Sequence, residues 1–168
     1  MKKSGFIFLA TLLGFTASSA YASNVATSTM GATLVNAISI ANNTGLNFGY
    51  IVQGATMGTV VVPAVASPTR TATGGIGLGN VGATSSASFT VTGVANATYA
   101  ITLPSSVTIY DGGYSMIVNT FASLPASTGT LSGTGSQTMY VGATVNVGGN
   151  QPFLTGFSGT FNVIVAYN

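Results

Sequence analysis

The clearest structural signal in this chain is its C-terminal run from Gly156 to Tyr167, with the sequence GFSGTFNVIVAY. Large apolar side chains alternate along this run with small or polar ones. The apolar positions that share one face are Phe157, Phe161, Val163, Val165 and Tyr167. Because successive side chains of a strand point to opposite faces, the alternation predicts a β-strand with one buried face. We expect these five residues to contact the core.

Similar short runs, separated by Gly, Asn, Ser or Pro, recur through most of the chain. The runs that we interpret as strands are 34–40, ended by 42–45, and then 46–51, 58–65, 76–81, 87–92, 99–103, 107–110, 114–121, 138–141 and 143–147. Asp111-Gly112-Gly113 favours the positive φ of a tight hairpin turn, and Pro63 predicts a strand end or edge. Because the chain after Ala22 shows no helical period, the sequence predicts an all-β, immunoglobulin-like antiparallel β-sandwich.

The N-terminus has the features of an export signal. Lys2 and Lys3 precede the apolar run from Phe6 to Phe15, and the small-residue site Ala20-Tyr21-Ala22 follows. Such a segment is removed during secretion, and we predict cleavage after Ala22. The predicted organisation is a signal peptide over 1–22, an N-terminal arm over 23–34 and a sandwich domain over 35–168. The product is expected to cross the periplasm and to reach the cell surface or an extracellular fibre.

Charged residues are almost absent. The sequence has three Lys or Arg, one Asp or Glu, no His and no Cys, so Arg70 and Asp111 are the only charged side chains after Ala22. One carboxylate cannot build a usual metal site or a general acid and base pair. One arginine cannot supply the phosphate contacts on which nucleic-acid binding depends. We therefore expect no catalytic residues, no metal, no cofactor and no nucleic-acid partner, and hence no enzyme.

Several motif-like features have simpler interpretations. The stretch 77–82 matches G-x-G-x-x-G, but the nucleotide-binding fingerprint needs a following helix and an acidic residue about 20 positions on, and both are missing. The triplets 42–44 and 96–98 match the glycosylation pattern, and we interpret both as turns. We expect Arg70 and Asp111 to be separate, solvated charges, and the tyrosines to pack in the core or across strands.

The lack of charge bears directly on the sheet edges. Natural sheets protect their edges with Lys, inward charges, Pro and bulges, and this chain has no Lys after Ala22. A neutral surface also promotes association. We therefore predict a fibre of copies of this chain, in which an extended strand of one subunit completes the sandwich of the next. The candidate donor face carries Met30, Ala32 and Leu34; whether the arm is donated or forms an internal strand stays open.

Particular segments resemble a known family. They are 46–49 (LNFG), 69–71 (TRT), 73–75 (TGG), 88–93 (SFTVTG), 96–99 (NATY), 101–104 (ITLP) and 159–163 (GTFNV). Together they resemble an exported bacterial family, domain-of-unknown-function family forty-four-zero-two, from about Leu46 to Asn168. The arm and the C-terminal run are more loosely similar to chaperone–usher pilus subunits. This second resemblance implies a periplasmic chaperone and an outer-membrane usher as partners.

Two other functions stay open from the sequence. A surface adhesin could read glycans through Tyr, Asn and Gln, although the sequence names no host or surface glycan. A small outer-membrane β-barrel also has alternating strands behind a signal peptide. The runs found here are mostly shorter than the roughly 9–11 residues that such strands need. The fibre subunit is therefore the leading prediction.

Overall fold

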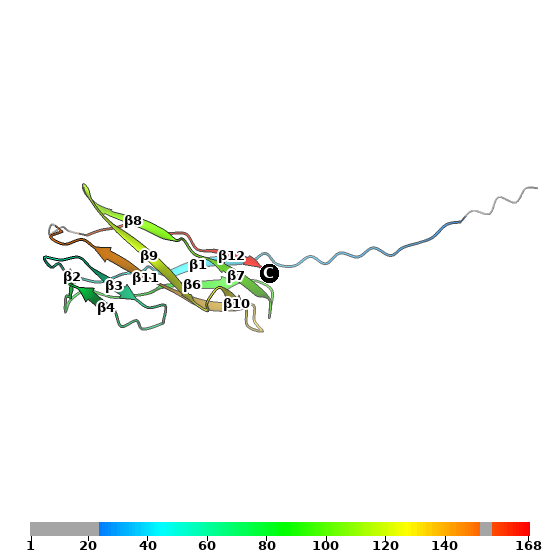
Figure 1. Ribbon diagram of the computed structural model, residues 1–168. Helices are drawn as coiled ribbons and strands as arrows, with labels where there is room; N and C mark the ends of the chain where they lie inside the picture. Colours follow the sequence, from blue (N-terminus) through cyan, green and yellow to red (C-terminus); the bar gives the residue numbers. More distant parts are fainter. Residues whose placement is uncertain (1–23, 152–155) are drawn as a thin grey trace, which may run out of the picture. The chain divides into compact units, whose positions relative to one another are not determined.

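The computed structural model describes residues 24–151 and 156–168. All elements within these residues are β-strands, and their pairings in the sheets are antiparallel. A seven-stranded sheet, a three-stranded sheet and a two-stranded sheet form a sandwich-like fold (Figure 1). The predicted all-β antiparallel class is therefore confirmed. The predicted signal peptide, residues 1–22, lies outside the described residues.

Two of the three sheets contain most of the strands. The seven-stranded sheet contains β1 (Ser39–Thr44), β3 (Gly58–Val62), β4 (Thr71–Gly74), β6 (Ala87–Thr92), β8 (Ser106–Asp111), β9 (Tyr114–Leu124) and β11 (Ser136–Val147). The three-stranded sheet contains β7 (Thr98–Thr102), β10 (Thr128–Thr130) and β12 (Ile164–Tyr167), in the order β10-β7-β12. The strands β2 (Ile51–Val52) and β5 (Gly77–Leu78) form the small third sheet.

The long strand β11 organises the large sheet. Its first half pairs with β6 and its second half with β3, while β9 pairs along the opposite edge. The sequence predicted two strands divided at Gly142, but β11 runs through this residue without a break. A Cβ at position 142 would lie 2.6 Å from the Ala64 nitrogen, so only glycine fits where β11 exchanges one partner strand for another. The predicted division was therefore wrong.

The core lies between the two larger sheets. Inward residues of β6 and β11, including Phe89, Val91 and Met139, are buried. Ile101 of β7 packs against them from the facing sheet. A further buried cluster, around Val60 and Val145, fills the other half of the molecule. The period-two alternation that predicted the strands therefore reports which face of each strand is buried.

The turns follow the sequence prediction more closely than the strand lengths do. Gly112 and Gly113 connect β8 to β9, and Gly112 has a φ of 58°. The strand β3 ends immediately before Pro63, as predicted. Asn96 lies in a turn with a φ of 60°, as predicted, whereas Thr98 of the same triplet begins β7. The triplet at 42–44 instead belongs to β1, where a register shift opposite β6 accommodates the polar residues.

The largest correction concerns the C-terminal run. Only residues 164–167 form a strand, β12, whereas 156–163 make a single bridge, between Ser158 and Tyr110. Burial nevertheless alternates as predicted, with Phe157, Phe161 and Val163 half-buried and the residues beside them exposed. The run lies along β7 and β8, but its middle forms no ladder. The strands β4 and β10 were not predicted, because they are short and rich in Thr and Gly.

Candidate functional site

Arg70 is a structural residue and not the solvated charge that the sequence predicted. Its guanidinium donates hydrogen bonds to the carbonyl oxygens of Phe48 at 2.5 Å, Tyr50 at 2.7 Å and Gly79 at 2.5 Å. A side chain on Gly49 would collide with it, because a Cβ there would lie 2.6 Å from the Arg70 Nη1. The planar fork of arginine suits this arrangement of several acceptors. Arg70 thus fastens the chain before β2 to the chain after β5.

Asp111 also has a specific partner. One of its carboxylate oxygens, Oδ2, accepts a hydrogen bond from the backbone N–H of Gly156 at 2.7 Å. Nearby, Tyr110 and Ser158 exchange two backbone hydrogen bonds of 2.9 Å each. These contacts attach the start of the C-terminal run to the β8–β9 hairpin. The two charges therefore act separately, as predicted, but neither is simply solvated.

The described residues also bear on metal ligands, on membrane-spanning helices and on the glycine-rich stretch. Within 24–151 and 156–168, no three His, Cys, Asp or Glu side chains gather where a metal ion could bind. The same part of the chain has no helix of the length and apolarity that crossing a membrane requires. The G-x-G-x-x-G stretch contributes to β5 and the loop after it, and its glycines Gly79 and Gly82 pack beside Tyr50. This confirms the interpretation as turn and strand glycines.

The tyrosines divide into two groups. Tyr99 is fully buried, donates its hydroxyl to Gln137 Oε1 at 2.7 Å, and has its pKa raised by this burial. Tyr50, Tyr110 and Tyr114 are 63%, 58% and 49% exposed, so these three do not lie in the core. The exposed rings lie in the loop before β2 and in the β8–β9 hairpin.

Several described strands, namely β1, β4, β10 and β12, pair on one side only. We name two of these edges, which lie beside each other, the open rim. It consists of residues 38–46 on one side and residues 161–167 on the other. Among the described strands, β1 pairs with β6 alone and β12 with β7 alone. No backbone hydrogen bond joins the two sides in the described residues. Each side therefore presents free N–H and C=O groups, as an edge strand does.

The two sides of the open rim run in opposite directions. Ser39 lies opposite Thr92 and Asn42 opposite Phe89, so β1 starts beside the end of β6 and runs away from it. The loop after β6 leads into β7, and Tyr167 pairs with Tyr99 at the start of β7. The strand β12 therefore ends near the point where β1 begins. Figure 1 shows β1 in cyan and β12 in red at this end of the sheets.

Inward side chains along the open rim are incompletely covered. Those from the β1 side are Ile38, Ile40 and Leu46, and those from the C-terminal side are Phe161, Val163, Val165 and Tyr167. All are half-buried. The inward residues Phe89 and Val91 of the neighbouring strand β6 are buried. Burial therefore falls from the interior of the sandwich to this rim, although the residues on both sides are apolar.

One end of the open rim is closed by Tyr167. Its hydroxyl donates a hydrogen bond to the Asn36 carbonyl at 2.9 Å and accepts one from the Val94 N–H at 2.7 Å. The single hydroxyl thus joins the chain that leads into β1, the β6–β7 loop and β12. The other end, near Phe161, has no comparable link among the described residues. We call these the Tyr167 end and the Phe161 end.

The predicted donor residues lie in an exposed segment. Residues 24–38 form no strand, and the chain divides into two units between Thr33 and Leu34. Met30 is 98% exposed and Leu34 is 97% exposed, and Ala32 is exposed as well. The predicted C-terminal contacts, by comparison, all pack against buried clusters. Phe157 packs against the cluster around Val60. The other four, Phe161, Val163, Val165 and Tyr167, pack against the clusters that contain Phe89 and Val91.

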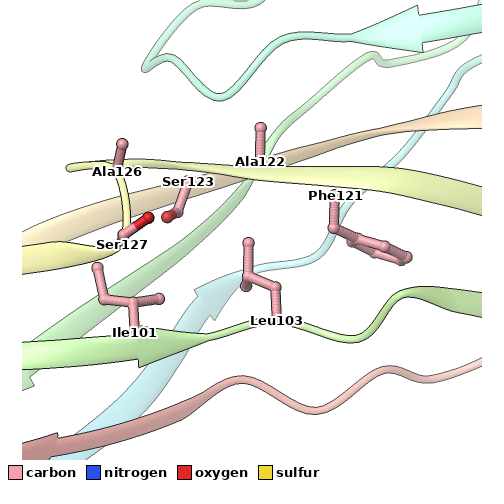
Figure 2. A pocket seen from close by; sticks show the side chains of 7 residues that line it. All are labelled: Ile101, Leu103, Phe121, Ala122, Ser123, Ala126 and Ser127. Carbon is pink, nitrogen blue, oxygen red and sulfur yellow. The ribbon is translucent and has the colours of Figure 1, made fainter.

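A pocket of about 380 Å³ lies where the two larger sheets separate. Its lining residues are Ile101, Leu103, Phe121, Ala122, Ser123, Ala126 and Ser127. Figure 2 shows Ile101 on β7 and Leu103 immediately after this strand, both facing β9, with the hydroxyl oxygens of Ser123 and Ser127 directed toward each other. The pocket carries no charge, and it is formed by segments that are separated in the sequence. Sequence reasoning had no signal with which to find it.

The described residues thus form an all-β, sandwich-like fold with very few charged side chains, and the open rim is one of its exposed strand edges. The chain belongs to the family described as a domain of unknown function, DUF4402, whose model matches residues 38–167. No curated protein and no solved structure matches it. The sequence predicted which residues of the C-terminal run face the core, but not that this run forms one side of a rim. The β1 side was missed as part of a site, although the alternation of Ile38 and Ile40 was visible.

Proposed function

We propose that this protein is a structural subunit of a bacterial surface fibre, assembled by β-strand donation. In this proposal an extended segment of another chain adds to the open rim and pairs with both of its edges. The observation that carries the proposal is the incomplete burial of apolar residues on both sides, exemplified by Ile40 and Val165, beside free backbone groups. An added strand would cover the side chains and satisfy the backbone at once.

The N-terminal arm supports this proposal as the donor. It carries no charge between Asn24 and Leu34, so nothing opposes its burial beside the neutral rim. Met30 and Leu34 are large, apolar and exposed. Burying each would contribute about 1.5–3 kcal/mol before ordering costs, and backbone hydrogen bonds would add to this. The partners are then copies of the same chain, with a periplasmic chaperone and an outer-membrane usher proposed for assembly.

Deletion of residues 23–32 tests the proposal. We expect the shortened chain to be exported and folded, because the described part of this segment contributes to no sheet. It should remain monomeric in size-exclusion chromatography, while the full-length chain forms fibres visible by negative-stain microscopy of sheared surface material. A full-length chain that stays monomeric at high concentration would contradict the proposal. Loss of folding after the deletion would show that the segment is an internal strand.

A glycan-binding adhesin is a second candidate. The observation that favours it is the exposure of Tyr110 and Tyr114 in the β8–β9 hairpin, since aromatic rings present flat apolar faces at a surface. A glycan array with monomeric protein separates the two functions. Selective binding that is lost in a Tyr110→Ala and Tyr114→Ala variant would favour the adhesin, whereas a purely structural subunit should give no selective signal.

A further inference from the structure

We propose that the pocket between β7 and the end of β9 binds a small uncharged alcohol, whose apolar body lies against Ile101, Leu103 and Phe121 and whose hydroxyl meets Ser123 and Ser127. None of these residues belongs to the open rim, and the inference does not depend on the proposed function. Three features carry it: the size and lining of the pocket, the backbone conformations that aim the two serines, and the lack of charge around them.

The pocket has the size and the lining of a small-molecule site. Its volume of about 380 Å³ lies within the roughly 300–1,000 Å³ of ligand pockets, whose walls are mostly apolar with a few polar groups that fix orientation. Ile101, Leu103 and Phe121 are apolar and only half-buried, so an apolar ligand would cover surface that now faces the pocket. Ser123 and Ser127 provide the polar groups, with their hydroxyl oxygens directed toward each other in Figure 2.

A β-bulge turns Ser123 toward the space between the sheets. In the ladder with β11, two residues of β9, Thr120 and Phe121, lie opposite a single residue. A regular strand would continue the inward face of Val118 to Leu124. The bulge instead brings Phe121 and Ser123 inward and leaves Leu124 51% exposed, because one extra residue reverses the faces of those that follow. A hydroxyl therefore lines the pocket where a leucine would otherwise fill it.

Two residues that flank this lining have backbone conformations that their side chains disfavour. Thr120 has a φ of 51° and Ser127 a φ of 57°. Glycine adopts this left-handed region freely, whereas a β-branched residue such as threonine is rarely found there. Strained residues of this kind gather at ligand sites, where the surrounding structure holds them in place. Here Thr120 lies in the bulge, and the Ser127 carbonyl accepts a hydrogen bond from the Ile101 N–H at 2.8 Å.

The lining selects an uncharged ligand. None of its residues is charged, and Arg70 and Asp111 bind backbone groups elsewhere in the domain. An ionised ligand would lose its hydration in this pocket without gaining a counter-charge, which is costly. The ligand is therefore neutral.

A single hydroxyl matches the two serines. Each serine hydroxyl has one donor and two acceptor positions, so a ligand hydroxyl can donate to one serine and accept from the other. A hydrocarbon would use neither serine. A sugar would turn further hydroxyls toward Ile101 and Phe121, where they would have no hydrogen-bond partner. An aliphatic or aromatic alcohol fits both parts of the pocket.

Ligand-observed saturation-transfer NMR tests the site, because it detects binding whether the protein is monomeric or assembled. The full chain, as exported, is titrated with p-cresol, with toluene, which lacks the hydroxyl, and with p-toluate, which carries a carboxylate in its place. The variant S123A with S127G removes both serine hydroxyls, and glycine adopts the φ of position 127 without strain. S123L fills the pocket. S115A is the matched control, because Ser115 of β9 is exposed and lies outside the lining.

We expect p-cresol to bind, and S123A with S127G to weaken its binding about three- to tenfold, which corresponds to one or two net hydrogen bonds. Toluene should bind this variant as well as it binds the unsubstituted chain. S115A should behave like the unsubstituted chain, S123L should bind neither compound, and p-toluate should show no saturable binding to any of the proteins. Circular dichroism checks that each variant is folded.

Three other outcomes would overturn the proposal. A loss of p-cresol affinity in S123A with S127G that does not exceed the loss for toluene would mean that the serines do not recognise a hydroxyl. Binding of p-toluate as tight as that of p-cresol would exclude selection for a neutral ligand. Absence of saturation transfer to p-cresol, or binding that persists in a folded S123L protein, would exclude this pocket as the site.

Discussion

Arg70 shows how one cation can be accommodated where no carboxylate is near. Its guanidinium contacts the carbonyls of Phe48, Tyr50 and Gly79, which would otherwise have to find donors elsewhere. Nothing in the sequence distinguishes this role from that of a solvated arginine, because the three acceptors are backbone atoms. The contacts depend on the path of the chain around Gly49, whose φ is 68°.

Replacement of Arg70 should therefore destabilise the fold through lost hydrogen bonds to carbonyl oxygens, and not through the loss of an ion pair. We expect R70M to lower the free energy of unfolding by about 1–3 kcal/mol, because it leaves carbonyl acceptors without their donor. R70K should recover little, since a single ammonium cannot reproduce the planar fork. Urea denaturation of the three proteins measures this. An R70K protein as stable as the unsubstituted chain would show that charge alone matters.

Tyr99 provides a pH-dependent prediction. Burial raises its pKa above the ordinary value of 10.0, so the folded state retains the phenolic proton at a pH where the unfolded state loses it. Its contribution to stability is complete below pH 10.0 and is lost as the pH rises through the raised pKa. Y99F should be about 1 kcal/mol less stable at pH 8, because it loses the bond to Gln137. Between pH 8 and 11 it should also lose less stability than the unsubstituted chain.

Denaturant titrations at half-unit pH steps would measure both effects. The two proteins differ only at position 99, so the comparison isolates the contribution of this side chain. Equal alkaline loss in the two proteins would contradict the assignment.

Individual strands were predictable where burial alternates along a single segment. The strand β6 has the predicted bounds Ala87–Thr92, since Ala87, Phe89 and Val91 all face the core. The strand β10 was not predictable, because Gly129 at its centre has no side chain whose polarity could indicate a buried face. A side chain at this position would collide with the Tyr99 ring. The residues before Ile164 do not pair with β7, because pairing depends on the neighbouring strand as well as on the run itself. The sequence of the run alone does not contain that information.

The two faces of β12 should respond differently to charge. V165D places a carboxylate among the apolar residues of the open rim, where an added strand would bury it at high cost. I164D places the same group on the outward face, because Ile164 is 60% exposed. We expect V165D to fold and not to assemble, and I164D to do both.

Light scattering measures assembly of these two variants, and circular dichroism of the monomer measures folding. Because Val165 is itself half-buried, some loss of stability is expected for V165D alone. Full assembly of a folded V165D protein would exclude this rim from the contact between subunits.

At the scale of the whole molecule, the scarcity of charge affects both folding and association. After Ala22, the sequence holds one cation and one anion, at Arg70 and Asp111. Both are used within the domain, so long-range electrostatics neither steers nor opposes contact between copies. Association then depends on burial of apolar surface and on backbone hydrogen bonds, both of which the open rim can provide under the proposed function.

Assembly should consequently be insensitive to ionic strength. Salt screens interactions between exposed charges, with a Debye length of about 10 Å at 0.1 M and about 3 Å at 1 M, and here there is almost nothing to screen. We expect the rate and extent of assembly, followed by light scattering, to change less than about twofold between 0.05 and 0.5 M NaCl. A variant with T160K and I164K provides the matched control, because it adds like charges at Ile164 on the rim and at Thr160 immediately before it in every subunit. That variant should assemble poorly at low salt and recover as salt rises, since like-charged edges repel one another unless they are screened. Strong salt dependence in the unsubstituted chain would mean that ionic contacts, and not the neutral edges of β1 and β12, join the subunits.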